Sequence, residues 1–240
     1  MTRHHINVNL NMERTIMSVL IGCETSGISR RAWEAQGFDV VSCDLLPSED
    51  NAPNHYICDV LEMLKSQTWE YAQLHPTCTA LSSSGSATYG IGMIKHYLRL
   101  EAIAWTTELW NVAKEQSGYV CMENPVGVLS TQSTIDVKPQ YIQPWQHGHP
   151  ESKKTGLWLH ELEPLKESNN VKHIFDKLPK KEQQRLHWLP PSKDRWKIRS
   201  RTYEGIALAI AKQFGQQIKD ERDEDISPAD FDPPHNYEGE

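Results

Sequence analysis

The sequence predicts an α/β protein with a doubly wound, mostly parallel sheet. Short apolar runs of strand length alternate with helical segments at the spacing of βαβ units. A glycine-containing turn follows the first apolar run, and acidic residues end the next two. At 240 residues the chain can bury one substantial core and carry a small lobe or tail besides.

The first half of the chain supplies most of the expected elements. Apolar composition predicts strands, and helical periodicity closed by a glycine predicts helices. The expected strands are 17–21, 38–44, 56–60, 69–74 and 119–122, and the expected helices are 28–36 and 94–116. Residues 79–92 are rich in Ser and Gly and predict a flexible loop.

The second half is less regular. It predicts a strand at 156–159, a short helix at 180–187 and a well-patterned helix at 202–217. The expected organisation is a flexible N-terminus at 1–15, a main domain made of 16–159 and 199–218, a small basic insertion at 160–198, and an acidic, disordered tail at 219–240.

The net charge of -7 hides an uneven distribution. Residues 220–240 carry nine acids and one base, and their removal leaves 24 bases against 23 acids. Residues 153–201 hold 13 Lys or Arg and 6 Asp or Glu. The basic third therefore indicates either contact with a nucleic-acid backbone or an ordinary solvated surface.

Nothing in the sequence indicates a membrane protein. The longest apolar runs are too short to span a bilayer, and the N-terminus lacks the apolar core of a signal peptide. Five cysteines without a paired framework fit a reducing compartment. We expect a cytoplasmic protein, with Cys23, Cys43, Cys58 and Cys121 in or beside strands as core residues.

The turn at 22–27 joins a strand to a helix, where glycines let a backbone approach a ligand. It is not a complete dinucleotide fingerprint, and a simple tight turn stays open as an alternative. Asp44 and Asp59 end the next two strands, where they could grip a ribose diol and an adenine amino group. Together these features suggest an adenosine-containing cofactor without a pyrophosphate.

Two further motifs follow strand ends. Cys78 lies on a Pro-containing turn just past the strand at 69–74, and Glu123 follows the strand at 119–122. Open α/β sheets place their chemistry at such positions. We interpret Cys78 as a nucleophile and Glu123 as its acid partner. A buried small residue and a turn cap are the structural alternatives, and zinc binding at His75 and Cys78 lacks a second ligand pair.

The ordered set of motifs resembles the DNA cytosine-5 methyltransferases, in particular the compact versions of bacteriophages. The similarity spans about residues 18–215. It rests on 21–27 with 33–38, on Asp44 and 58–60, on 75–78 in place of Gly-Pro-Pro-Cys, on 123–125 in place of Glu-Asn-Val, on 147–154, and on the last helix.

The resemblance implies a methyltransferase of the Rossmann-like type that uses S-adenosyl-L-methionine and a flipped-out cytosine in double-stranded DNA of a bacterial or phage-infected cell. Cys78 would attack carbon 6 and Glu123 would act at N3 of cytosine. The residues implied at the cofactor are Gly22, Glu24, Thr25, Gly27, Asp44, Asp59 and His75. Those implied at the DNA are Ser82, Ser84, Asn124, Lys153, Lys154, Arg199 and Arg201. No metal is implied.

Several positions depart from the family pattern. Thr77 replaces a proline, Thr79 stands where Gln is usual, and Thr155 replaces an arginine. The insertion 160–198 is also far smaller than the usual target-recognition domain, which predicts short or relaxed sequence specificity.

Three other functions remain compatible with the sequence. A methyltransferase fold without catalysis could serve as a DNA- or protein-binding module, for example one that acts against host defence. A free cytosine nucleotide could be the substrate, which would explain the small insertion. Amino-group methylation using 124–125 is disfavoured, because Val126 and Gly127 offer no aromatic ring for stacking a base.

Overall fold

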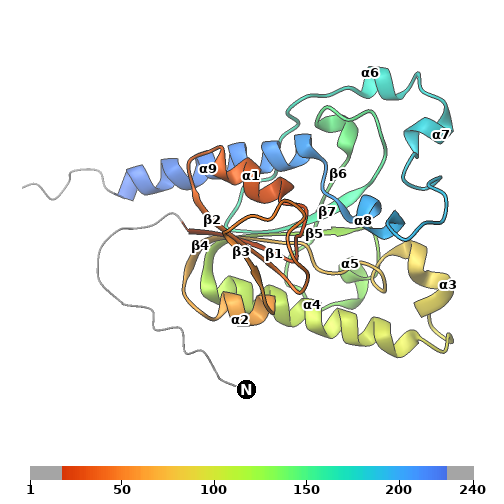
Figure 1. The fold of residues 1–240 in the computed structure, drawn as a ribbon, viewed down its shortest axis with the longest axis horizontal. Coiled ribbons are helices and arrows are strands. Elements are labelled where there is room, and N and C mark those ends of the chain that lie inside the picture. The colour runs from red at the N-terminus through yellow and green to blue at the C-terminus, as the bar shows by residue number, and fades with distance from the viewer. Residues whose placement is uncertain (1–17, 226–240) are drawn as a thin grey trace, which may run out of the picture.

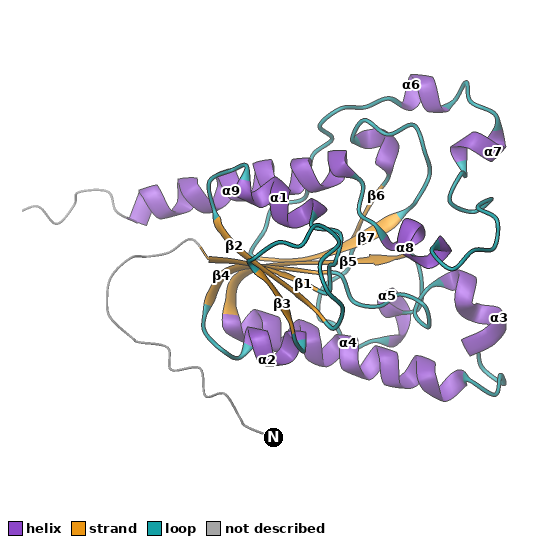
Figure 2. Ribbon diagram, in the orientation of Figure 1, coloured by secondary structure: helices purple, strands orange, loops and turns teal. Residues whose placement is uncertain are grey.

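The computed structural model describes residues 18–225, and they form a single mixed sheet between two helical layers (Figures 1 and 2). The expectations for residues 1–15 and for the end of the acidic tail lie outside the described residues. The sheet has seven strands in the order β3-β2-β1-β4-β5-β7-β6. Their bounds are β1 Ser18–Gly22, β2 Asp39–Asp44, β3 His55–Ile57, β4 Trp69–Leu74, β5 Ser117–Pro125, β6 Gln140–Ile142 and β7 Thr155–His160.

The strands from β1 to β5 pair in parallel, whereas β7 runs antiparallel to β5 and β6 antiparallel to β7. The strand order reverses between β1 and β4, and this is the switch point at which open α/β sheets bind ligands. A mostly parallel sheet with one antiparallel strand near its edge is the doubly wound arrangement expected from the sequence. The predicted fold class is therefore confirmed.

Helices cover both faces of the sheet. One layer contains α1 (Ile28–Glu34) and α9 (Glu204–Asp225), and the opposite layer contains α2 (Val60–Leu64) and α4 (His96–Gln116) (Figure 1). Alternation along the strands supplies both cores. In β1, Val19 and Ile21 pack with α1 and α9, while Leu20 packs with α2 and α4.

Shorter helices gather beyond the carboxyl ends of the strands and in the segment between β7 and α9 (Figure 1). Their bounds are η1 Ser83–Gly85, α3 Ser86–Tyr89, α5 Leu129–Gln132, η2 Pro144–Gln146, α6 Lys172–Phe175, α7 Lys180–Gln183 and α8 Arg195–Ser200. Among residues 18–225, no helix is long and apolar enough to cross a bilayer.

Four sequence expectations need correction. Residues 83–89 are helical rather than an unstructured loop, and the strand expected at 119–122 extends over 117–125 because β7 pairs along its whole second half. The expected strand 56–60 ends at Ile57, and Val60 begins α2. The helix α9 spans Glu204–Asp225 and so continues beyond residue 217, where the expected helix ended.

We predict that Leu109→Ala in α4 destabilises the protein by about 2–5 kcal/mol, because Leu109 is fully buried and its loss leaves a cavity. The matched change Leu100→Ala lies on the same helix but removes a side chain that is 54% exposed, so it should alter stability by at most about 0.5 kcal/mol. Urea unfolding of both variants measures the two changes in stability. Equal losses of stability would contradict the burial of Leu109 in the core.

Candidate active site

The site forms where β1, β4 and β5 end side by side. Leu74 in β4 pairs with Gly22 in β1 and with Met122 in β5, so the segments that follow emerge at one edge of the sheet. The backbone N–H of His75 donates to the Gly22 carbonyl at 3.0 Å and extends this pairing by one residue. The sequence-predicted residues of three motifs are thereby brought together.

Glu123 lies inside β5, opposite Leu157 of β7, rather than beyond the end of the strand. Its side chain is buried, 8% exposed, and its Oε2 atom accepts a hydrogen bond from the Thr202 hydroxyl at 3.1 Å. The His75 Nδ1 atom lies 3.4 Å from the same oxygen. Glu123 is therefore contacted by His75, which directly follows β4, and by Thr202, which lies just before α9.

Charge coupling within this cluster outweighs the cost of burial. Burial raises the pKa of Glu123, but the hydrogen bond and charge of His75, with smaller effects of Lys153 and Thr202, bring it below its ordinary value. Burial lowers the pKa of His75, yet Glu123 raises it above its ordinary value. The pair thus favours its charged forms.

Cys78 lies on the turn after β4 and is half-buried. Burial raises the pKa of its thiol, while the positive charges of Lys153 and Arg199 lower it in part. The negative charge of Glu123 also raises the pKa of the Cys78 thiol. Asn124 connects the two motifs directly, since its Nδ2 atom donates to the Pro76 carbonyl at 3.0 Å and is buried.

The turn after Cys78 is held by contacts that the sequence did not indicate. Arg99 in α4 is buried and donates to the carbonyls of Ala80 at 2.8 Å and Ser82 at 3.3 Å. Ser82 pairs with Gly127, and its hydroxyl lies 3.0 Å from that of the exposed Ser84. A Cβ on Gly127 would meet the Leu81 carbonyl at 2.0 Å, so a glycine is required there.

The loop after β1 is organised around Glu24. Its Oε1 atom accepts from the Ser26 hydroxyl at 2.6 Å and from the Ser29 N–H at 3.0 Å, which caps α1. Its Oε2 atom is buried, and no group in residues 18–225 donates to it. Gly27 has φ 69°, a backbone conformation that favours glycine.

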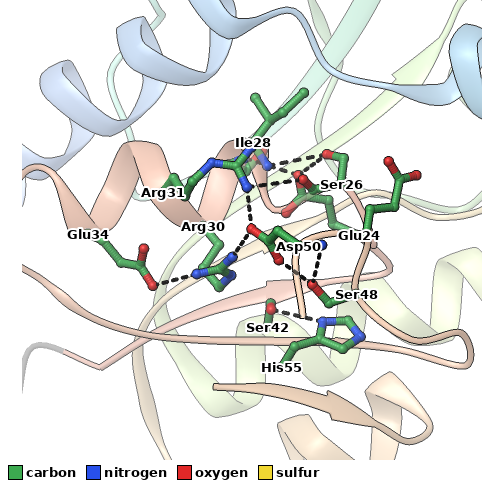
Figure 3. A network of polar contacts seen from close by, with 12 residues as sticks. Glu24, Ser26, Ile28, Arg30, Arg31, Glu34, Ser42, Ser48, Asp50 and His55 are labelled. Atoms are coloured by element: carbon green, nitrogen blue, oxygen red, sulfur yellow. Dashed lines mark hydrogen bonds and ion pairs between the residues drawn. The ribbon is translucent and has the colours of Figure 1, made fainter. Parts of the chain in front are cut away.

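A polar network fixes the next loop against α1. Figure 3 shows Asp50 between Arg30 and Arg31, with Ser48 on its other oxygen and Glu34 bonded to Arg30. Arg30 is buried, and its charge is therefore neutralised internally. The backbone N–H of residue 49 also donates to the carbonyl of residue 25 at 2.8 Å, so the two loops are joined.

The acids expected at the cofactor have local partners. Asp44 accepts from the Leu46 N–H at 2.9 Å, and burial raises its pKa. Asp59 caps α2 by accepting from the Leu61 N–H at 2.7 Å. A Cβ on Gly22 would meet Val60 at 2.6 Å, so this glycine is needed for packing.

Glu24 and Asp44 fit a cofactor that contains both an amino acid moiety and a ribose. The unpaired, buried Glu24 Oε2 requires a donor, and an α-ammonium group of an amino acid moiety is such a donor. Asp44 stands at the end of β2 beside the switch point, where a ribose diol binds in related sheets. Thr25 is half-buried between Glu24 and Ser26 in the same loop.

The basic residues expected at DNA are partly engaged within the protein. Lys153 Nζ donates to the Arg201 carbonyl at 2.9 Å, and the Arg201 side chain forms an ion pair with Glu49. Lys154 lies over the Tyr141 ring at 4.6 Å, and Arg199 is half-buried in α8. Thr155, at the place of a family arginine, is buried in β7.

The cysteines expected in the core divide into two groups. Cys43 and Cys121 are buried, whereas Cys23 and Cys58 are half-buried. Burial raises the pKa of Cys23 to about 12, so it is not a reactive thiol at neutral pH. Within the part of the chain that is described, no three His, Cys, Asp or Glu side chains are grouped to hold a metal.

Sequence reasoning missed Thr202, Arg99 and Gln73. Gln73 is fully buried in β4, and a polar residue inside a buried strand was an available signal. Thr202 and Arg99 gave no such signal, because their partners are 79, 19 and 17 residues away.

We predict a pH window for the stabilising effect of the His75–Glu123 pair. The lowered pKa of Glu123 gives stability that is lost as pH falls through that pKa, below 4.5. The raised pKa of His75 gives stability that is lost as pH rises through that pKa, above 6.5. The free energies of unfolding of the wild type and of His75→Asn, measured from pH 4 to 9, should differ most between these limits. A difference in the free energy of unfolding that stays constant over this pH range would contradict the charge coupling between His75 and Glu123.

We also predict that Lys153→Gln slows alkylation of Cys78 by iodoacetamide about two- to fivefold near neutral pH. Removing this positive charge raises the pKa of the thiol and leaves less thiolate, at roughly 0.5–1 kcal/mol for a partly solvated pair. The neighbouring Lys154→Gln serves as the control, since Lys154 faces Tyr141. Peptide mass spectrometry measures the rates, and equal rates in both variants would refute the assignment.

Comparison with known proteins gives structural neighbours only. No family model and no curated protein matches the chain. Among solved structures, the Dnmt2 methyltransferase of S. pombe matches with a TM-score of 0.39 and 14% identity over 74% of this chain. Dnmt2 of Spodoptera frugiperda matches with a TM-score of 0.36 and 17% identity over 59%. The chain spans 61% and 49% of these two proteins. Its similarity to methyltransferases is at the level of the fold.

Proposed function

We propose that the protein transfers a methyl group from S-adenosylmethionine to carbon 5 of cytosine in DNA. The observation that carries this proposal is the placement of Cys78 just after β4 and of Glu123 in the neighbouring strand β5. Their two motifs are joined by the buried Asn124 side chain, which bonds to the Pro76 carbonyl. A thiol and a carboxyl on neighbouring elements of one sheet are the groups that cytosine activation requires.

The reaction needs both residues because carbon 5 of cytosine is a poor nucleophile. The Cys78 thiolate adds to carbon 6, and the electrons of the 5,6 double bond move toward carbon 5 and N3. Lys153 and Arg199 help the thiol to ionise. Glu123 stabilises the charge that develops at N3 by a proton or a hydrogen bond. Once carbon 5 carries the methyl group, transfer of the carbon 5 proton to solvent would expel the Cys78 thiolate and restore the 5,6 double bond.

S-adenosylmethionine would supply the electrophilic methyl group. Glu24, with its unpaired buried oxygen, and Asp44 are the residues proposed to hold it, together with Thr25, Gly27 and Asp59 around them. Cytosine inside a duplex cannot reach such a site, so the nucleotide must be flipped out. We propose that the segment after Cys78, which Arg99 anchors to α4, contacts the extruded base.

We propose that affinity for DNA comes mainly from backbone contacts. The segment between β7 and α9 carries the basic excess, and α8 exposes Trp196 and Ile198 beside Lys197 and Arg199. This small segment offers little surface for reading a long site, which favours short or relaxed specificity.

A mechanism-based trap tests the proposal. The protein is incubated with S-adenosylmethionine and duplex DNA containing 5-fluorocytosine in varied sequence contexts. Fluorine at carbon 5 blocks the final elimination, so we expect a covalent protein–DNA adduct at Cys78 and none with Cys78→Ser. Glu123→Gln should slow adduct formation at least tenfold, because it removes the acid.

The controls separate the other functions. Adduct formation with a free fluorinated nucleotide but not with DNA would favour a nucleotide-modifying enzyme. Binding of unmodified DNA without any adduct, on duplex or single strands, would favour a non-catalytic binding module. Either result would overturn the proposed activity.

A further inference from the structure

A line of buried hydrogen bonds leads from α1 to the candidate acid. The Trp33 indole N–H, which can only donate, bonds to Gln73 Oε1 at 2.9 Å, and the Tyr71 hydroxyl lies 3.3 Å from the same oxygen. These two donors fix the orientation of the Gln73 amide. Its NH₂ group therefore faces Ser29 Oγ and His75 Nε2, each at 3.2 Å.

This orientation determines which nitrogen of His75 carries a proton. With an amide NH₂ directed at it, Nε2 of the neutral ring is an acceptor, and the proton lies on Nδ1. In the imidazolium both nitrogens are protonated, and Ser29 Oγ, 3.4 Å from Nε2, is the acceptor beside that nitrogen. In both charge states Nδ1–H faces Glu123 Oε2, 3.4 Å away.

The same contacts make the two oxygens of Glu123 unequal. Oε2 lies 3.4 Å from Nδ1 of His75 and accepts a hydrogen bond from the hydroxyl of Thr202. No residue within 18–225 donates a hydrogen bond to Oε1. A proton taken up by this carboxyl therefore belongs on Oε1, and an ionised Glu123 has Oε1 available as an acceptor for an amino group.

We propose, building on the proposed function, that His75 is a positioning residue that holds Glu123 through Oε2 and leaves Oε1 for the cytosine ring. The resemblance to the methyltransferase family implied a contact with the cofactor for this residue instead. Besides Glu123, the charges that act on His75 are those of Glu24 in the loop after β1 and Lys153 in the segment before β7. Gln73 in β4 and Ser29 in α1 complete its surroundings.

The tautomer of His75 can be measured without any enzymatic activity. Long-range ¹H–¹⁵N spectra, assigned by comparison with His75→Asn, should show a protonated Nδ1 and an unprotonated Nε2 in the neutral ring. A proton on Nε2 in the neutral ring would overturn the proposal. This measurement remains decisive even if the protein forms no adduct with DNA, so the two proposals can fail separately.

Two variants of similar shape test the positioning role in the fluorocytosine trap. His75→Asn keeps an N–H donor near the place of Nδ1, and we expect its adduct rate within about threefold of wild type. His75→Leu removes the donor to a charged group, and we expect a rate about 10- to 100-fold lower. Equal losses in both variants would overturn the proposal.

Cofactor affinity distinguishes positioning from a cofactor contact. Calorimetric titration with S-adenosylmethionine should give the same affinity for wild type and His75→Asn. A weaker affinity in this variant, with a normal adduct rate at saturating cofactor, would assign His75 to the cofactor and refute the positioning role. The pH profile supplies a further check, since the part of the wild-type profile that follows His75 titration should be absent in His75→Asn.

Discussion

One buried amide, that of Gln73, connects the parts of the candidate site. It lies in the central strand β4 with no solvent exposure, so each of its polar atoms needs a partner inside the protein. Trp33 and Ser29 from α1 and His75 from the following turn provide those partners. The helix, the strand and the candidate acid are thereby tied into one unit, and loosening any contact would leave an unsatisfied polar group in a core.

The sheet geometry adds a second constraint. Because the order reverses between β1 and β4, the loop after β1 and the turn after β4 meet at the switch point, where open α/β sheets bind ligands. Cys23 enters this loop with φ 60°, and its N–H bonds to the Cys43 carbonyl at 2.8 Å, which ties the loop to β2. The loop after β1 carries Glu24 and Gly27, while Cys78 follows β4 and Glu123 lies in β5.

The sequence predicted those features that depend on local patterns. The apolar runs gave β1, β2 and β4 almost to the residue, and helical periodicity located α4 and α9. The strand β6 was missed because three residues at a sheet edge carry no periodic signal. The end of β5 was missed for a different reason, since its pairing with β7 is a long-range contact.

The candidate site shows the same division. Cys78 and Glu123 were proposed from their positions at strand ends, and the structure places both at one edge of the sheet. Their supports could not be inferred in this way. Thr202 reaches Glu123 across 79 residues, and Arg99 reaches back from a helix to the turn it anchors. Such contacts depend on how the layers pack, which the spacing of residues along the chain does not encode.

Residues 153–201 carry an excess of Lys and Arg, but the number of basic residues overstates how many charges are free to bind a phosphate. Lys153 and Arg201 bond to backbone carbonyls and to Glu49, and Arg185 forms an ion pair with Glu151 at 2.9 Å. These charges hold the segment between β7 and α9 against the main domain. If the protein binds DNA as proposed, a phosphate must compete with a partner already in place at each of them. The face of α8 that exposes Trp196 has fewer internal contacts for a phosphate to displace. It also carries Arg199, whose charge lowers the pKa of Cys78. Binding there would therefore be coupled to the nucleophile, because a phosphate that neutralises Arg199 would remove part of the field that lowers the pKa of the thiol.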